Sequence, residues 1–201
     1  MTIVPTARRA AGALTLAAVV CAVLGVGLEF VRADETPPRP ADPRLARRFE
    51  KVLVVDFDGD IEAIMRAYMG RRVAKAKDEG FDCIVLRIDS PGGTVLHSEE
   101  IANELHDLSD DIHVVAWVPE QALSGACMVA MACDEIILGS AGTLGDCQPI
   151  VLDPGGGGIK PVGEKIESPL RALFRKYAAK NGYPSLLAEA FVSAHLHVIQ
   201  V

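Results

Sequence analysis

The 201-residue chain is poor in aromatic side chains, has no surplus of positive charge and contains no paired-cysteine motif. Aromatic residues make up 5% of the chain and hydrophobic residues 50%, so the core has to be built from Val, Ile, Leu and Ala. The net charge of -7 at pH 7 leaves no basic footprint, which excludes nucleic acid as a partner. Because no C-x-x-C pair occurs, we expect buried thiols rather than a zinc or redox site. A disulfide between Cys133 and Cys147 is the alternative.

Residues 1–33 have the pattern of a targeting segment. Two arginines precede an uncharged apolar tract at 10–28, and a small-residue cleavage site follows it. The tract is also long enough to span a bilayer, so a cleaved signal peptide and a retained membrane anchor both stay open. Residues 34–50, in which four prolines lie among charges, predict a solvated linker. We therefore place the folded domain at 51–201.

Short apolar runs alternate with amphipathic segments in the first part of this domain. The runs predict strands at 52–57, 83–88, 112–118 and 135–138. The segments between them predict helices at 61–77 and 98–108, and a third helix that begins at Ser124. This alternation favours right-handed βαβ crossovers, and hence an α/β fold with a mostly parallel sheet.

The last part of the domain has a different pattern. Residues 139–158 are rich in glycine and predict a long loop or a β-excursion. An amphipathic helix that ends at Asn181–Gly182 follows, and then a short helix at 185–192 and a strand at 196–201. Because the chain stops inside this last strand, we expect a C-terminal portion to be missing.

Two segments carry groups suited to catalysis. One is the loop after the second strand, in which Gly92 and Gly93 permit a close approach of the backbone and can direct N–H groups at a carbonyl oxygen. A plain Pro-Gly turn is the alternative, and the loop matches neither the dinucleotide fingerprint nor a Walker motif. The other is Ser124, expected where a helix begins and N–H groups lack partners. A helix N-cap is the alternative there.

Together the two segments resemble the ClpP/crotonase superfamily. Arg87–Gly93 is followed, about thirty residues later, by Ala122–Ala126 and then by Ala132–Ile136. This combination is similar to the membrane-associated serine peptidases of the NfeD and signal peptide peptidase A (SppA) types, which pair an S-P-G-G-like loop with a nucleophilic serine at a helix start. The resemblance covers residues 52–201, and it implies a ClpP/crotonase-like fold of repeated βαβ units.

The resemblance also implies an oxyanion hole and a nucleophile. Ser124 would attack the substrate carbonyl. The N–H groups of Gly93 and Gly125 would hold the resulting oxyanion, with Gly92 shaping the loop. ClpP has a histidine where this chain has Cys147, so the resemblance disfavours a Ser-His-Asp triad.

The NfeD-type peptidases use a Ser-Lys dyad instead. Lys165, which lies 41 positions after Ser124 and before the last long helix, is similar to their lysine in context and spacing. A lysine has to be neutral to accept a proton. Burial beside the serine would have to lower its pKa by a few units from ~10.4.

The resemblance therefore implies an exported, membrane-associated serine endopeptidase of the bacterial cell envelope, either membrane-anchored or periplasmic. The expected partners are a peptide or a membrane-protein segment as substrate, the membrane through the N-terminal segment, and further copies of the chain. Acyl transfer of this kind needs no metal or cofactor. Two alternatives stay open, a non-catalytic scaffold with the same fold and a crotonase-type acyl-CoA enzyme. Export argues against the second, because CoA is cytoplasmic.

Overall fold

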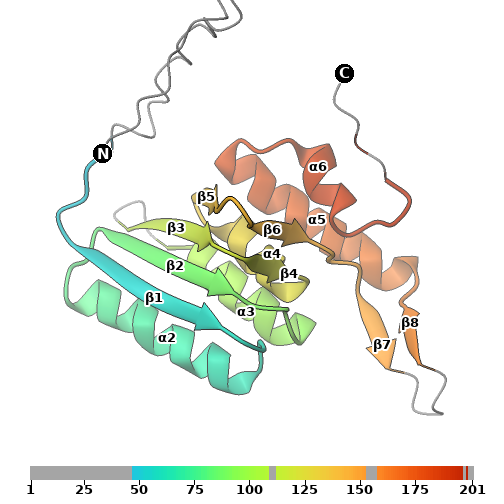
Figure 1. The fold of residues 1–201 in the computed structure, drawn as a ribbon, viewed down its shortest axis with the longest axis horizontal. Coiled ribbons are helices and arrows are strands. Elements are labelled where there is room, and N and C mark those ends of the chain that lie inside the picture. Colours follow the sequence, from blue (N-terminus) through green and yellow to red (C-terminus); the bar gives the residue numbers. More distant parts are fainter. Residues whose placement is uncertain (1–46, 109–111, 153–157, 197, 199–201) are drawn as a thin grey trace, which may run out of the picture. The chain divides into compact units, whose positions relative to one another are not determined.

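The computed structural model describes residues 47–108, 112–152, 158–196 and 198. They form a mixed α/β structure around a four-stranded parallel sheet (Figure 1), which confirms the predicted alternation of strands and helices. The strands of this sheet are β1 (Val52–Asp58), β2 (Cys83–Asp89), β3 (His113–Val118) and β5 (Glu135–Leu138). The helices between them are α2 (Ala63–Asp78), α3 (Val95–His106) and α4 (Gly125–Ala132).

The four strands follow one another across the sheet in the order β1-β2-β3-β5. Right-handed crossovers that always advance in the same direction place their helices on one face of a parallel sheet. The side chains alternate accordingly. Val55 and Phe57 of β1 are buried beneath the helices, whereas Val54, Trp117 and Ile137 are exposed on the opposite face. The core therefore lies between the sheet and its helices.

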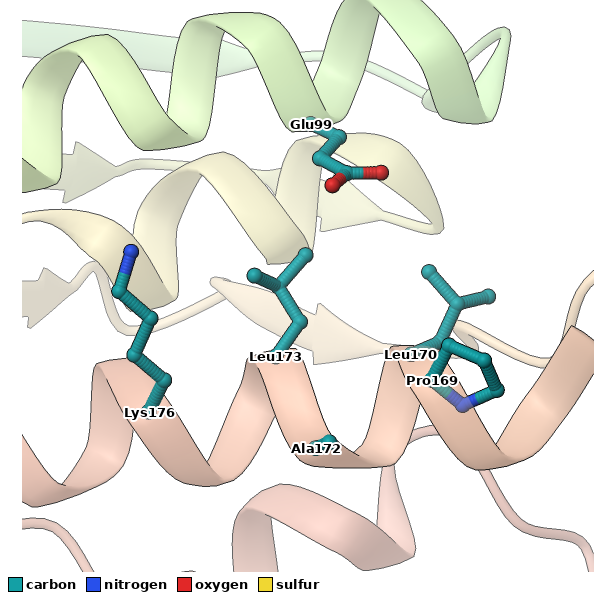
Figure 2. Close-up of a pocket in the computed structure, with 6 residues that line it drawn as sticks. All are labelled: Glu99, Pro169, Leu170, Ala172, Leu173 and Lys176. Carbon is teal, nitrogen blue, oxygen red and sulfur yellow. The ribbon is translucent and has the colours of Figure 1, made fainter.

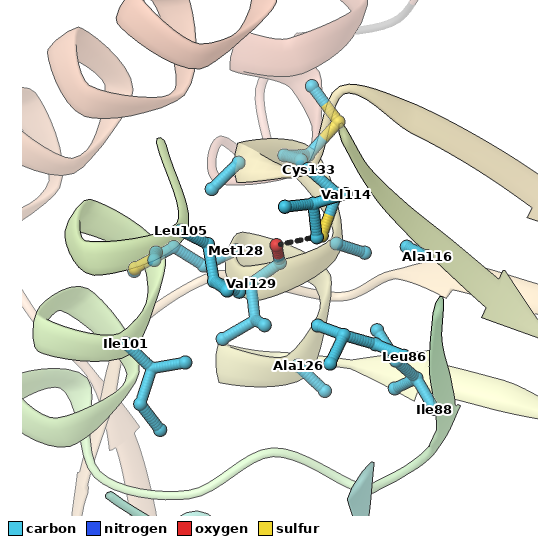
Figure 3. Packing of buried hydrophobic residues seen from close by; sticks show 14 of the residues in the cluster. Leu86, Ile88, Ile101, Leu105, Val114, Ala116, Ala126, Met128, Val129 and Cys133 are labelled. Carbon is cyan, nitrogen blue, oxygen red and sulfur yellow. Dashed lines mark hydrogen bonds between the residues drawn. The ribbon is translucent and has the colours of Figure 1, made fainter. Parts of the chain in front are cut away.

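Helix α4 lies in the middle of this core. All eight of its residues are buried. Figure 3 shows Ala126, Met128 and Val129 of α4 packed with Ile101 and Leu105 of α3 and with side chains of the sheet. Small and flexible side chains make such complete burial of a helix possible. A short strand, β4 (Gln121–Leu123), precedes α4 and pairs in parallel with β6 (Thr143–Gly145). The pairing with β6 therefore holds the segment that leads into α4.

The glycine-rich segment contributes β6 and then an antiparallel hairpin of β7 (Ile150–Leu152) and β8 (Ile159–Pro161), so the predicted β-excursion is confirmed. Helices α5 (Glu164–Asn181) and α6 (Ser185–Ala190) follow. The predicted strand at 196–201 is wrong where it can be compared. Leu196 and Val198 are exposed and belong to no strand, because no strand of the described residues pairs with them. The other residues of that range lie outside the described part of the chain.

Among the described residues, no helix is both long and apolar enough to cross a bilayer. The segment 1–33, predicted to be a signal peptide or a membrane anchor, lies outside the described residues, as does most of the predicted linker at 34–50.

Asn181 at the end of α5 ties this helix to the C-terminus of α4. Its side-chain nitrogen donates to the carbonyl oxygens of Met131 at 3.2 Å and Cys133 at 2.6 Å. We expect Asn181→Ala to lower the free energy of unfolding by about 1–3 kcal/mol, because these carbonyls at a helix end lose their donor. Urea unfolding measures the change. Asn181→Asp keeps the shape but not the donor and should cost at least as much, so wild-type stability of the Asp variant would contradict this role.

Candidate active site

Ser124 joins β4 to α4 in a backbone conformation that residues other than glycine rarely adopt. Its φ is 51° and its ψ is -122°, a conformation that strains a non-glycine residue by about 1–3 kcal/mol. The side chain is half-buried and makes no capping hydrogen bond to α4. Helix capping therefore does not explain a serine here, whereas strain of this kind is typical of catalytic and ligand-binding residues.

Neighbouring backbone groups hold Ser124 in this conformation. Its N–H donates to the carbonyl oxygen of Gly145 at 2.9 Å, and its own carbonyl accepts the N–H groups of Cys127 at 3.1 Å and Met128 at 3.3 Å. The hydroxyl oxygen, by contrast, has no hydrogen-bond partner among the described residues. The backbone of Ser124 is fixed while its hydroxyl is available for reaction.

The glycines of the loop after β2 stand against the start of α4. Gly92 has a φ of 100°, and a Cβ built on it would lie 2.6 Å from Ser124 Cβ and 2.8 Å from Gly125 N. A Cβ built on Gly125 would lie 2.1 Å from Ser98 Oγ and 3.5 Å from Gly93 N. Side chains are therefore excluded at positions 92 and 125, and this exclusion lets the loop approach the helix.

Gly93 and Gly125 each carry an N–H group without an acceptor among the described residues. Gly125 begins α4, where the first N–H groups have no intrahelical carbonyl and the helix dipole favours negative charge. On either side of Gly93 the loop is fixed, because Gly92 O accepts the Ile61 N–H at 2.9 Å and the Thr94 N–H donates to Ile61 O at 3.0 Å. Two such N–H groups beside a strained serine can hold an oxyanion.

Cys147 lies behind Ser124 and supports its backbone. The Cys147 thiol donates to the carbonyl oxygens of Ser124 and Gly145, in both cases at 3.4 Å. Burial raises the pKa of this thiol well above its usual range, and its hydrogen bond with Cys127 adds to the rise. Cys147 is thus a neutral thiol that does not reach the Ser124 hydroxyl. Cys133 and Cys147 are both free thiols, so the Cys133–Cys147 bridge is not formed.

These buried thiols give a prediction about reactivity. Iodoacetamide at pH 8 should leave Cys133 and Cys147 unmodified in the native protein, because burial raises the pKa of both thiols and only the thiolate reacts. The same reagent should modify both after unfolding in urea. Peptide mapping by mass spectrometry reads the two states, and rapid native modification of Cys147 would contradict its placement behind Ser124.

Lys165 lies in the first turn of α5 rather than before this helix, and its side chain is exposed. The burial beside Ser124 that a lysine base requires is therefore absent in this structure. Side-chain contacts nevertheless connect the start of α5 to the nucleophile. Glu167 accepts a hydrogen bond from Gln148 Nε2 at 3.0 Å, and Gln148 follows Cys147, whose thiol contacts Ser124.

The described histidines do not contact Ser124. Three of them lie beside carboxylates, in the pairs His97–Glu100 at 3.3 Å, His106–Asp107 at 2.7 Å and His113–Asp134 at 3.6 Å. His195 is exposed, and His197 lies outside the described residues.

Two buried serines belong to the frame of this site, although the sequence indicated no role for either side chain. Ser90 directly follows β2 and precedes the glycine loop, and Ser98 lies in α3 against Gly125. Serine is common at turns and helix starts, so neither residue type nor spacing distinguishes a buried serine there from an exposed one. Only the fold reveals them.

A hollow of about 370 Å³ lies between α3 and α5 (Figure 2). Its apolar lining includes Leu170 and Leu173 of α5, while Glu99 and Lys176 bring one charge of each sign to it. Ser124 does not line this hollow. Among the described residues, no group of three His, Cys, Asp or Glu side chains is placed to hold a metal ion.

Comparison with known proteins identifies relatives of this chain. The family model for the N-terminal domain of NfeD1b matches residues 51–201. "Putative protease slr0021" of Synechocystis sp. is 32% identical over 103 residues, which are 51% of this chain and 37% of that protein. "Membrane protein NfeD1b" of Bacillus subtilis is 29% identical over 96 residues, which are 48% of this chain and 22% of that protein. The chain thus spans well under half the length of these two relatives.

Solved structures of the 1510-N membrane-bound stomatin-specific protease, which comes from Pyrococcus horikoshii, share the fold. A serine-to-alanine variant superposes with a TM-score of 0.66 at 22% identity, over 73% of this chain and 72% of that one. A lysine-to-alanine variant in complex with a substrate peptide gives the same TM-score and identity over 72% and 66%.

Proposed function

Because the chain belongs to the family of NfeD1b N-terminal domains, we propose that residues 51–201 form a serine endopeptidase that uses Ser124 as nucleophile and Lys165 as base. One observation carries the proposal. A strained serine with an available hydroxyl lies beside two N–H groups, those of Gly93 and Gly125, that have no partner among the described residues. The names of the slr0021 and 1510-N proteins, both called proteases, add support for peptide-bond cleavage.

In this proposal Ser124 Oγ attacks the carbonyl carbon of the substrate and passes its proton to Lys165. The N–H groups of Gly93 and Gly125 hold the negative charge that develops on the carbonyl oxygen. Lys165 then returns the proton to the leaving amine, and water releases the acyl group from the serine.

The case for Lys165 as the base depends on spacing and on anchoring. The serine and the lysine replaced in the two 1510-N variants are 41 positions apart in that protein, as are Ser124 and Lys165 here. The turn of α5 that carries Lys165 is held, through Glu167 and Gln148, to the segment behind Ser124. A bound peptide would cover this exposed turn and exclude water from it.

The proposed substrate is an extended peptide segment. It would lie beside the Gly92–Gly93 loop and form main-chain hydrogen bonds with it, as peptides do when they add to a strand edge. The wider setting is also part of the proposal. The protein acts at the cell envelope after export, is held at the membrane by its N-terminal segment and associates with further copies of itself.

The proposal is tested with four proteins, namely the wild type, Ser124→Ala, Lys165→Ala and the control Lys176→Ala, which removes another exposed lysine from α5. A library of quenched fluorescent peptides reports cleavage, and a fluorophosphonate probe reports labelling of the serine. We expect the wild type and the control to cleave and to be labelled. Lys165→Ala should cleave at least about 10²-fold more slowly, because the serine loses its general base.

Each other outcome excludes part of the proposal. If Lys165→Ala cleaves peptides at the wild-type rate and Ser124→Ala is inactive, Lys165 is not the base, but Ser124 is still the nucleophile. A wild type that cleaves no peptide and takes no label would favour the scaffold, and hydrolysis of acyl-CoA without peptide cleavage would favour the crotonase-type enzyme.

A further inference from the structure

Ser90 has no exposed surface and lies between the two segments that form the proposed oxyanion hole. Its backbone N–H donates to Gln121 O at 3.1 Å, and its carbonyl accepts the Leu123 N–H at 3.0 Å. Because β4 leads directly to Ser124, these two bonds fix the distance between the end of β2 and the nucleophile. The residue that precedes the glycine loop is thus also the residue that holds the nucleophile strand.

The side chain of Ser90 makes two further hydrogen bonds. Its hydroxyl donates to Gly59 O at 2.6 Å, and the same oxygen accepts the Gly92 N–H at 3.1 Å. A hydroxyl has one proton, so the bond to Gly59 fixes its direction and turns a lone pair toward Gly92. Ser90 is therefore not a second nucleophile, since its proton is used and its oxygen is buried.

These bonds determine which loop N–H group is left for a substrate. Ser90 Oγ takes the N–H of Gly92, and the carbonyl of Ile61 takes that of Thr94. Gly93, between them, keeps its N–H without an acceptor among the described residues. Without the Ser90 hydroxyl, the Gly92 N–H would be buried and unsatisfied, a loss that favours rotation of the peptide units next to it.

We propose that Ser90 is a positioning residue, whose buried hydroxyl holds the Gly92–Gly93 loop so that the Gly93 N–H is already directed at the oxyanion before a substrate binds. The inference rests on the proposed peptidase function. Preorganised donors lower the free energy of a transition state because they do not have to reorient during the reaction. Ser90 should therefore affect the transition state more than the binding of uncleaved substrate.

The test measures the binding of two ligands, a peptide aldehyde and an uncleaved peptide. Three proteins are compared, namely the wild type, Ser90→Ala, and Ser90→Thr, which keeps a hydroxyl. A peptide aldehyde forms a tetrahedral adduct with Ser124, so its binding needs the oxyanion hole. The uncleaved peptide does not need the oxyanion hole, and its binding is measured in proteins that also carry Ser124→Ala. We expect Ser90→Ala to weaken the aldehyde by about 10²-fold, the typical effect of losing one oxyanion donor, and the uncleaved peptide by less than about threefold. Ser90→Thr should bind the aldehyde more tightly than Ser90→Ala. Equal weakening of both ligands, or of neither, would overturn the proposal.

A second measurement does not depend on catalysis. Hydrogen exchange, monitored by NMR, should be at least about tenfold faster at the Gly92 amide in Ser90→Ala than in the wild type, because this amide has lost the Ser90 hydroxyl as its acceptor. The Thr94 amide, bonded to Ile61, serves as the internal control. If the wild type binds no aldehyde and cleaves no peptide, the peptidase function fails, while unchanged exchange at Gly92 would still overturn the role of Ser90.

Discussion

Replacing Ser124 by alanine is expected to slow peptide cleavage by at least about 10³-fold, as the loss of a catalytic nucleophile does in serine peptidases. The expectation follows from two observations. The Ser124 hydroxyl has no hydrogen-bond partner among the described residues, and Ser124 is next to Gly125 and the Gly92–Gly93 loop, whose N–H groups can hold an oxyanion. The rate of cleavage of a quenched fluorescent peptide measures the effect. Circular dichroism should show an unchanged fold, because alanine can take the same backbone path.

A second substitution at this position separates strain from chemistry. Ser124→Gly should be as inactive as Ser124→Ala but more stable than it by about 1 kcal/mol, because glycine relieves the strain at a φ of 51°. Urea unfolding of the two variants measures the difference. A glycine variant that is less stable than the alanine variant would show that the backbone at Ser124 is unstrained.

Replacing Gly92 by alanine is expected to abolish activity and also to lower stability. The new Cβ would lie within 2.8 Å of Ser124 Cβ, Leu123 O and Gly125 N, so the loop has to move away from α4. The backbone at Gly92, with a φ of 100°, also strains any side chain. We expect a loss of about 3–5 kcal/mol in the free energy of unfolding. Cleavage should fall by at least about 10²-fold at a temperature at which the variant is folded, because the Gly93 N–H moves with the loop.

Gly80→Ala is the matched control. Gly80 also has a positive φ, 67°, but a Cβ built on it would meet nothing within 4 Å. This variant should therefore show only the strain of a left-handed alanine, about 1–2 kcal/mol, and wild-type cleavage per folded molecule. Equal losses of activity in Gly80→Ala and Gly92→Ala would mean that the effect comes from general destabilisation rather than from the site.

The repeated β-α units could be predicted because their signals are local. Strand β3 follows a run of apolar residues, and the buried residues Ile101, Ala102 and Leu105 of α3 recur at the spacing of one helix face. The start of α4 at Ser124 was also predictable from the run of small side chains after it. The strand at 196–201 was not, because an apolar run becomes a strand only where a partner edge is available, and Leu196 and Val198 pair with no strand in the described part of the chain.

The candidate site was only partly predictable. Gly92 and Gly93 stand out in the sequence, but the role of Ser90 depends on its contact with Gly59, 31 residues away, and no local pattern indicates it. The strain at Ser124 comes from the packing of β4 and the glycine loop rather than from its own residue type. The residues that carry the chemistry can thus be proposed from motifs, whereas the groups that hold them can be found only from the fold.

Peptide mapping of the trapped intermediate shows whether the acyl group of the substrate is transferred to Ser124. The protein is mixed with the p-nitrophenyl ester of a peptide that it cleaves, and the reaction is quenched in acid within seconds. The protein is then digested, and the mass of each fragment is measured. We expect one acylated fragment, with the added mass on Ser124, and no such mass in Ser124→Ala. Acylation of another residue in the wild type, with Ser124 unmodified, would contradict this expectation.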